Sequence, residues 1–326
     1  MSFKNIIGQN VAIQAIKNMM GQDHVRGAYL FLGPDGVGKR TTSIEFGKAV
    51  NCELNRDDAC GDCESCNKID AHNHPDVFTV FPEGPSHYIK IEQIRKIIYQ
   101  ASLKPYEGKK RIFIITGAEN MTREAQNAFL KLLEEPPQNH ILILTASNVS
   151  GLLSTVVSRC KVVKFYSLNQ EDIQDFLQKE GANQEEAILF SHMAMGSLGK
   201  AIDFKEKDVI AGRNRIINDF FLRKSALLRE NVLTGHITGD IEESLYMLLC
   251  WYRDLLISKF TQDKRELLNI DRSEEIFSYS GKFSREKLEK DILNIMKTIG
   301  YIRANMNPKI ALFNMAVELK LNSKRG

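Results

Sequence analysis

The chain has no long hydrophobic run, and this excludes one class of protein at the start. None of its apolar stretches approaches the roughly 20 residues that a membrane-spanning helix needs. Its first residues, MSFKNIIGQNVAIQAIKNMM, mix charged and amide side chains where a secretory signal would be apolar. We therefore expect a cytoplasmic protein that makes no contact with a membrane.

The chain also lacks an excess of charge of either sign. Its 44 lysine and arginine residues nearly balance 41 aspartate and glutamate residues, which leaves a formal net charge of +3. Proteins that bind nucleic acid through their overall charge are more basic, so any DNA contact must be local or shared with partners. A content of 43% hydrophobic and 26% charged residues is ordinary for a globular protein, and 326 residues suffice for two or three domains.

Cysteine is scarce and unevenly distributed. In a reducing compartment six cysteines do not suggest a disulfide framework. Four of them, Cys52, Cys60, Cys63 and Cys66, follow the pattern C-x₇-C-x₂-C-x₂-C. Four thiolates at this spacing can surround one metal ion tetrahedrally, and the Gly and Asp residues between them allow the necessary turns. The pattern predicts a structural zinc site at about residues 52–66, with no open coordination position for a substrate.

The sequence around the cysteines fits other interpretations less well than zinc. An iron–sulfur cluster also uses C-x₂-C-x₂-C, but the x₃-C-P continuation is absent after Cys66. Isolated buried thiols would need apolar surroundings, and this segment is polar. His72 and His74 could compete as ligands, but beside four cysteines we interpret them as loop residues. Cys160 and Cys250 lie in apolar segments, which is typical of core cysteines.

Short β-branched and aromatic runs alternate with helix-like segments in the first half of the chain. The runs are GAYLFLG, DVFTVFP, RIFIITG, HILILTA and CKVVKFY, and segments such as MTREAQNAFLKLLEE repeat apolar residues every three or four positions. Strands that alternate with helices pair in parallel, and coverage on both faces explains the continuously apolar IFII and ILIL. We predict an α/β domain with a parallel sheet over residues 1–166.

The strand signal disappears after residue 166. LNQEDIQDFLQKEG, NQEEAILFSHMAM and GSLGKAIDF predict three short helices, which we assign to a small helical domain over residues 167–208. Longer amphipathic segments follow in IINDFFLRKSALLRE, IEESLYMLLCWYRDLLISKF and REKLEKDILNIMKTIGYIRANM, and the last is NPKIALFNMAVELKL. These segments predict a helical bundle over residues 209–326.

The segment FLGPDGVGKRTTS has the spacing of a phosphate-binding loop. Gly33, Gly38 and Lys39 fit G-x-x-x-x-G-K, with Gly36 as a further glycine between them. The segment follows a predicted strand and precedes a predicted helix, where backbone N–H groups and the helix N-terminus attract anions. The plainer alternative is a glycine-rich turn with a surface lysine, but the strand–loop–helix context favours the phosphate loop.

Residues that an ATPase needs at this site are missing. Arg40 occupies the position of the hydroxyl that holds Mg²⁺ and adds a positive charge there. Thr41 cannot replace this hydroxyl, because side chains one residue apart on a helix are rotated by about 100°. The acidic pair expected after RIFII reads Thr116 and Gly117, and we interpret the later Glu119 as capping or solvating the helix start. We therefore expect no ATP hydrolysis and a vestigial loop that binds ATP or ADP weakly if at all.

Several motifs lie in a fixed order between Phe3 and Ala201. They are FKNIIGQNVAIQAI, AYLFLGPDGVGK, the cysteine segment, NAFLKLLEEPP, ILILTASN, VVSRC and GSLGKA. Together they resemble the clamp-loader branch of the AAA+ proteins, and within it the delta-prime subunits of bacterial DNA polymerase III. The C-terminal NMNPKIALFNMAVELKL is similar to the collar of that family, so the resemblance covers essentially the whole chain.

The resemblance implies an AAA+ domain with a zinc-binding insertion, a small helical lid and a C-terminal collar for oligomerisation. It implies a heteropentameric ring with motor ATPase subunits and a delta subunit, which opens a sliding clamp and loads it onto primed DNA during replication. Delta-prime subunits commonly lack an intact ATP site, which agrees with Arg40, Thr116 and Gly117. The chain would then have no intrinsic ATPase activity, yet belong to the DNA polymerase III holoenzyme, a nucleotidyltransferase complex of the nucleoid-associated replication machinery.

The family resemblance also gives a role to Arg159. In VVSRC the residues Ser158, Arg159 and Cys160 precede an apolar strand, and an arginine in such a loop can reach the γ-phosphate of ATP on a neighbouring subunit. We expect Arg159 to be a catalytic arginine finger in trans, against the alternative of an exposed arginine at a strand end. Asn148, where related ATPases sense the γ-phosphate, is interpreted as structural, and Lys200 stands where family members often carry arginine.

Two rival functions were considered. A motor ATPase of the same assembly would need the hydroxyl after Lys39 and the acidic pair, and both are absent. A zinc-dependent nucleic-acid-binding module would need basic residues beside the cysteines. The residues there are acidic instead: Glu53, Asp57, Asp58, Asp62 and Glu64.

Overall fold

The computed structural model of the chain describes residues 2–21, 25–54, 57–84, 87–207, 209–218, 241–304 and 306–321. It divides into two compact units, each described here by itself. Unit 1 comprises Met1–Asp172 and Gly196–Gly199, and unit 2 comprises Ile173–Met195 and Lys200–Gly326. No helix in the described part of the chain is both long and apolar enough to cross a membrane.

Unit 1 is built on a parallel sheet of five strands, as the sequence predicted. The strands are β1 (Gly27–Leu32), β2 (Val77–Val80), β3 (Arg111–Ile115), β4 (His140–Ala146) and β5 (Lys161–Lys164). Their order in the sheet is β2-β3-β4-β1-β5, and every neighbouring pair is parallel. The sheet therefore has β2 and β5 at its two edges.

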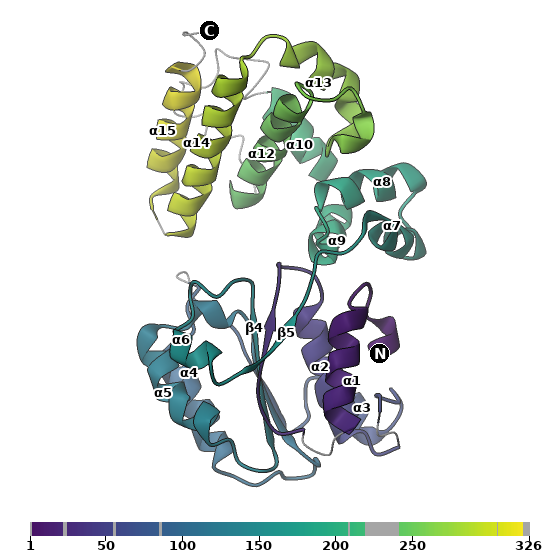
Figure 1. The fold of residues 1–326 in the computed structure, drawn as a ribbon, viewed down its shortest axis with the longest axis vertical. Coiled ribbons are helices and arrows are strands. Elements are labelled where there is room, and N and C mark those ends of the chain that lie inside the picture. The colour runs from purple at the N-terminus through teal and green to yellow at the C-terminus, as the bar shows by residue number, and fades with distance from the viewer. Residues whose placement is uncertain are drawn as a thin grey trace. The chain divides into compact units, whose positions relative to one another are not determined.

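Helices cover both faces of this sheet, which is why its central strands carry no polar face. Successive side chains of a strand point to opposite faces. Ile112 and Ile114 of β3 therefore join the core under α1 (Asn10–Gly21) and α2 (Lys39–Asn51). Phe113 and Ile115 join the core under α4 (Ile91–Ala101) and α5 (Arg123–Glu134). Figure 1 shows the two helical layers on opposite sides of the strands.

Short elements complete unit 1. They are η1 (Phe3–Asn5), α3 (Glu64–Asp70), η2 (Ala118–Asn120) and α6 (Ser154–Val157). The start of α5 is set by Thr122, whose Oγ1 accepts a hydrogen bond from the N–H of Ala125 at 3.2 Å. The helix ends just before Pro136 and Pro137, because proline disfavours the helical conformation in the residue before it.

Unit 2 is helical. Its helices are α7 (Gln170–Lys179), α8 (Gln184–Met193), α9 (Leu198–Glu206), α10 (Val209–Ile217), α12 (Ile241–Ile257), α13 (Ser273–Ser280), α14 (Arg285–Arg303) and α15 (Pro308–Leu321), with the short η4 (Lys264–Glu266) and η5 (Ile270–Arg272). Both α7 and α9 begin in unit 1. Most of the predicted helix IINDFFLRKSALLRE lies outside the described residues. Tyr246 Oη of α12 donates to Met193 O of α8 at 2.9 Å, so the short and long helices share this unit. The division at residues 166 and 208 into three domains stays a prediction.

A buried carboxylate holds the start of edge strand β2. Asp76 is fully buried, and it accepts hydrogen bonds from the N–H groups of Tyr106, Glu107 and Gly108 at 2.8–2.9 Å. Arg111 Nε of β3 donates to the same carboxylate at 2.9 Å. Burial by itself would raise the pKa of Asp76, but these donors outweigh it and hold the pKa below its usual range. The carboxylate therefore joins β2, β3 and the loop at Tyr106 through its ionised form.

We expect Asp76→Asn to destabilise unit 1 by about 3–5 kcal/mol, because it leaves Arg111 buried without its anion. Chemical denaturation followed by circular dichroism measures the effect. Since the folded pKa is depressed, the stabilisation is present above the unfolded pKa of about 3.9 and is lost as pH falls through the folded value. The difference in the free energy of unfolding between the wild type and Asp76→Asn should therefore become smaller at acidic pH. Asp263→Asn, which removes an exposed pair with Arg265, is the control and should change stability little.

Candidate functional site

The phosphate loop lies at the carboxyl end of β1, where ligands of parallel sheets bind. Gly38 adopts a positive φ of 96° just before α2 begins at Lys39. Gly36 also has a positive φ, of 72°, and a Cβ there would lie 2.2 Å from Ser197 Oγ. The N–H of Gly199 donates to Gly36 O at 2.9 Å. The segment Gly196–Gly199, part of the GSLGKA motif, is therefore packed directly on the loop.

Lys39 is turned back onto its own loop. Its Nζ donates to Gly33 O at 2.5 Å and to Pro34 O at 2.6 Å, and it lies 3.6 Å from Asp35 Oδ1. Burial lowers the pKa of Lys39, and the negative charges of Asp35 and Glu119 oppose this effect. A phosphate would have to replace these carbonyl contacts in order to bind Lys39.

Arg40, the residue after Lys39, contacts an aromatic ring. Its guanidinium lies 4.7 Å from the ring centre of Phe81, beyond the end of β2. The hydroxyls of the next helical turn bond to helix backbone. Thr42 Oγ1 donates to Gly38 O and Ser43 Oγ to Lys39 O, both at 2.8 Å.

Glu119 has a different role from the helix cap that we expected. Its Oε1 accepts hydrogen bonds from the N–H and the hydroxyl of Ser147, which follows β4. The capping of α5 is done by Thr122 instead. Glu119 Oε2 and Thr116 Oγ1 are buried without a hydrogen-bond partner among the described residues. Through Ser147, the carboxylate of Glu119 joins η2 to the segment that follows β4.

Arg159 lies just after α6 and forms an ion pair within the chain. Its Nε donates to Glu134 Oε1 at 2.8 Å, and a second guanidinium nitrogen also contacts this oxygen. A third donates to Thr155 O at 2.9 Å. The side chain of Arg159 is 32% exposed and that of Glu134 is 48% exposed. The partner comes from the LLEEPP motif, a contact between two motifs that the sequence analysis did not foresee.

Asn148 and Lys200, the other two candidates for nucleotide sensing, have local partners. Asn148 Oδ1 accepts hydrogen bonds from the N–H and hydroxyl of Ser150 and so closes a turn. The ammonium of Lys200 lies 4.0 Å from the ring centre of Tyr246 in unit 2. Neither contact involves the phosphate loop.

The four clustered cysteines are brought together as the spacing predicted. Cys52 follows α2, Cys60 lies in the loop, and Cys63 and Cys66 lie at the start of α3. Their sulfur atoms all lie within 4.8 Å of one another, and no disulfide joins them. A zinc ion bound at about 2.3 Å by four sulfurs sets sulfur separations of about 3.8 Å, so a small contraction would complete a site. The cluster could therefore hold a metal ion such as zinc.

Backbone N–H groups point at the sulfurs. The N–H groups of Asp62 and Cys63 lie 3.4 and 3.3 Å from Cys60 Sγ, and that of Cys66 lies 3.5 Å from Cys63 Sγ. Such donors favour thiolates. Burial raises the pKa of the Cys66 thiol to about 12, and a bound cation would favour its thiolate. The sequence suggested polar surroundings, but three of the four cysteines are buried in a small cluster with Ala59.

Polar contacts join the cysteine segment to the body of unit 1. Asp58 Oδ1 accepts from the N–H of Phe3 at 3.0 Å, and Glu53 accepts from the N–H of Ser65 at 3.1 Å. Lys109 donates to Cys52 O from the loop before β3. The acidic residues that we noted in this segment therefore serve in part as acceptors for its own backbone and for η1.

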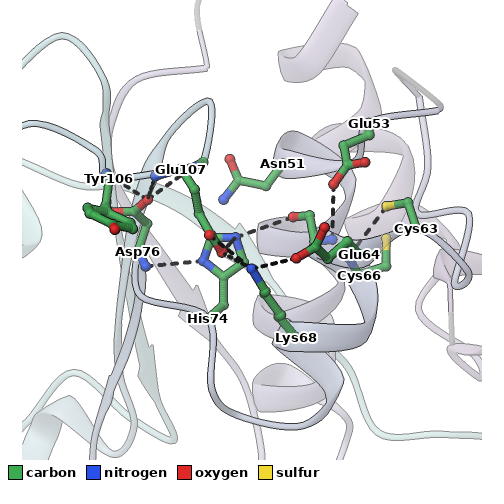
Figure 2. A network of polar contacts seen from close by, with 12 residues as sticks. Asn51, Glu53, Cys63, Glu64, Cys66, Lys68, His74, Asp76, Tyr106 and Glu107 are labelled. Carbon is green, nitrogen blue, oxygen red and sulfur yellow. Dashed lines mark hydrogen bonds and ion pairs between the residues drawn. The ribbon is translucent and has the colours of Figure 1, made fainter.

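Figure 2 shows a second connection, through α3 and His74. Lys68 pairs with Glu64 and Glu107, both at 2.9 Å. His74 Nε2 lies 3.4 Å from Ser65 Oγ, and its Nδ1 accepts from the N–H of Asp76 at 3.1 Å. Burial lowers the pKa of His74, which agrees with a neutral ring. His72 and His74 are not in the cysteine cluster, but only the structure reveals that His74 is buried and connects α3 to β2.

Comparison with known proteins agrees with this geometry. Residues 8–169 match the family model described as "DNA polymerase III, delta subunit". DNA polymerase III subunit delta' of Bacillus subtilis (strain 168) is 27% identical over 90% of this chain and 91% of its own length. A DNA polymerase III subunit gamma of Buchnera aphidicola subsp. Schizaphis graminum (strain Sg) is 33% identical over 66% of this chain and 60% of its own length.

A solved structure supports the fold. The gamma subunit-related protein of Thermotoga maritima superposes with a TM-score of 0.51 at 18% identity, over 96% of this chain and 99% of its own. The parallel sheet, the cysteine cluster and the match to delta' over 90% of the chain agree with one another. The chain belongs to the delta-prime family of DNA polymerase III clamp-loader proteins.

Proposed function

We propose that this protein is a non-hydrolysing delta-prime subunit of the replicative clamp loader. The observation that carries the proposal is the loss of metal ligands on both sides of the phosphate loop. Arg40 replaces the hydroxyl and is directed at Phe81, and Thr116 and Gly117 replace the acidic pair. Lys39, which keeps its position, is engaged with Gly33 and Pro34. The subunit would act through its shape and its contacts with partners.

The partners follow from the family. The protein would join motor ATPase subunits and a delta subunit in a heteropentameric ring in the cytoplasm, at the nucleoid-associated replication machinery. Through that ring it would help to place the sliding clamp on primed DNA. The similarity to gamma subunits leaves the motor ATPase as a second candidate, and the missing metal ligands argue against it.

Arg159 would supply the chemistry that this chain contributes. A guanidinium from a neighbouring subunit stabilises the charge that spreads over the γ-phosphate oxygens during transfer. The pair of Arg159 with Glu134 is partly exposed, and such pairs contribute less than about 1 kcal/mol. Arg159 could therefore exchange Glu134 for a phosphate at low cost, while Glu134 holds it near the surface until then.

The cysteine cluster would hold one structural zinc ion. Four thiolates close the coordination shell, so the metal would organise α3 and its loop and would leave no position for a substrate. The residues assigned to it are Cys52, Cys60, Cys63 and Cys66, whose sulfurs already converge.

We expect about one zinc ion per purified chain, measured by plasma mass spectrometry. Cys63→Ser should lose most of the metal and loosen the cysteine segment while the remaining fold, followed by circular dichroism, persists. Cys160→Ser, at a half-buried cysteine outside the cluster, should keep full zinc content. A brown protein with visible absorbance would indicate iron–sulfur instead, and a metal-free protein with four reactive thiols would exclude both.

The purified chain should show no Mg²⁺-dependent ATP hydrolysis above background, because both sets of metal ligands are missing. Phosphate release under steady-state conditions measures this, with Lys39→Ala as the reference. Hydrolysis that disappears in Lys39→Ala would identify a working motor and reject the proposal.

Arg159→Ala should leave the protein folded and able to enter the complex, but should reduce the DNA- and clamp-stimulated ATPase rate of reconstituted loader. The loss should be partial, because an arginine finger worth roughly 10³–10⁵ in rate acts on one site only. Arg285→Ala, which removes a comparable exposed pair with Glu289, is the matched control and should have no effect. Unchanged hydrolysis and clamp loading would show that Arg159 is an ordinary surface arginine.

A further inference from the structure

A groove runs beside edge strand β2 on the side of α2 and α3. Its volume is about 350 Å³, and its walls come from Arg40, Ile44, Ile69, Val77, Thr79 and Phe81. His72 and His74 lie at the end nearest α3. The groove is separate from the phosphate loop contacts of Lys39, and the proposed role of the subunit assigns no function to it.

Strand β2 is an edge strand, and on its outer side the N–H of Val77 donates to His74 O at 3.2 Å. In the described part of the chain, β3 is the only strand that pairs with it. The N–H of Ile112 donates to Asp76 O at 2.7 Å and that of Thr116 to Val80 O at 2.9 Å, so these carbonyls face β3. Because successive residues of a strand alternate, the N–H and C=O of Thr79 face away from β3. The side chain of Thr79 faces the groove, as do those of Val77 and Phe81.

The charge of the groove is positive and has no internal counterion. Arg40 is exposed, lies over the Phe81 ring, and is paired with no carboxylate in the part of the chain that the structure describes. By contrast, Arg111 and Arg159 each have an acidic partner. None of the residues that line the groove is acidic. Burial lowers the pKa of His74, which agrees with a neutral ring, so the positive charge of the groove is that of Arg40. A ligand complementary to this groove would therefore carry a carboxylate next to apolar groups.

We propose that the groove is a docking site for an extended peptide segment of a partner protein, which adds to β2 as a further strand. The N–H and C=O of Thr79, which have no hydrogen-bond partner among the described residues, would pair with the peptide backbone, and alternate apolar side chains would enter between Ile44, Ile69 and Val77. A carboxylate of the peptide, from an acidic side chain or from its C-terminus, would pair with Arg40.

The cysteine cluster also bears on the shape of the groove. Ile69 lies one turn after Cys66 on α3, so the segment that the cluster organises forms one wall of the groove. Asp76 fixes the opposite side by holding the start of β2. The strand edge and the wall of α3 are thus held by independent contacts, as a preformed peptide site requires.

The test uses a positional-scanning library of octapeptides, with free and with amidated C-termini, probed with the full-length zinc-loaded chain. We expect selection of an acidic residue, or of the free terminus, at one end and of apolar residues at alternate positions. The best peptide is then measured by fluorescence anisotropy. Arg40→Glu should weaken its binding by at least about tenfold, as expected for loss of a charge-assisted pair. Arg95→Glu, at an exposed arginine of α4 outside the groove, should retain it.

Backbone pairing is tested on the same peptide. N-methylation at the residues that face β2 should abolish binding, whereas methylation at the intervening residues should not. The bound peptide should also slow hydrogen exchange of the segment 77–81. No enrichment in the library, equal binding by Arg40→Glu, or unchanged exchange at 77–81 would overturn the proposal. Binding that survives N-methylation would identify a pocket for a side chain and not a strand site.

Discussion

The buried carboxylate of Asp76 is the constraint on which one whole side of unit 1 depends. The carboxylate accepts hydrogen bonds from three backbone N–H groups and from Arg111. The backbone N–H of Asp76 donates to His74. An ionised carboxylate can be buried only when such donors replace water. Because the donors come from separate segments, the single carboxylate sets the position of β2 relative to β3 and the Tyr106 loop. One wall of the groove depends on that position.

The phosphate loop illustrates how a ligand-binding motif can persist as structure. Its glycines still adopt the positive φ values that the turn requires, and Gly36 allows the close approach of Gly199. Lys39 satisfies its ammonium with Gly33 and Pro34. These acceptors offset the cost of burying the ammonium, since an unpaired buried charge is costly. The motif therefore contributes to the packing of unit 1 through its own contacts.

Two arginines of unit 1 differ in a way that bears on their roles. Arg159 is paired with a partly exposed glutamate, which keeps it ordered at the surface at little energetic cost. Arg40 has an aromatic ring beneath it and no acidic partner among the described residues. A guanidinium held on a ring keeps its hydrogen-bond donors available in the plane of the group. Under the two proposals above, each guanidinium would pair with an anion that another molecule supplies.

Local spacing in the sequence was sufficient for much of this protein. Alternating runs predicted the five strands, and the C-x₇-C-x₂-C-x₂-C pattern predicted the convergence of four sulfurs. The loss of ATP hydrolysis, inferred from the residues after Lys39 and after RIFII, stays a prediction. These features depend on residue identity and on short-range periodicity, which a sequence displays directly. The tertiary structure alone decided the direction of Arg40, the partner of Arg159, the acceptors of Lys39 and the burial of His74 and Asp76. Each of these depends on which distant segment approaches a side chain, and local patterns carry no information on that approach.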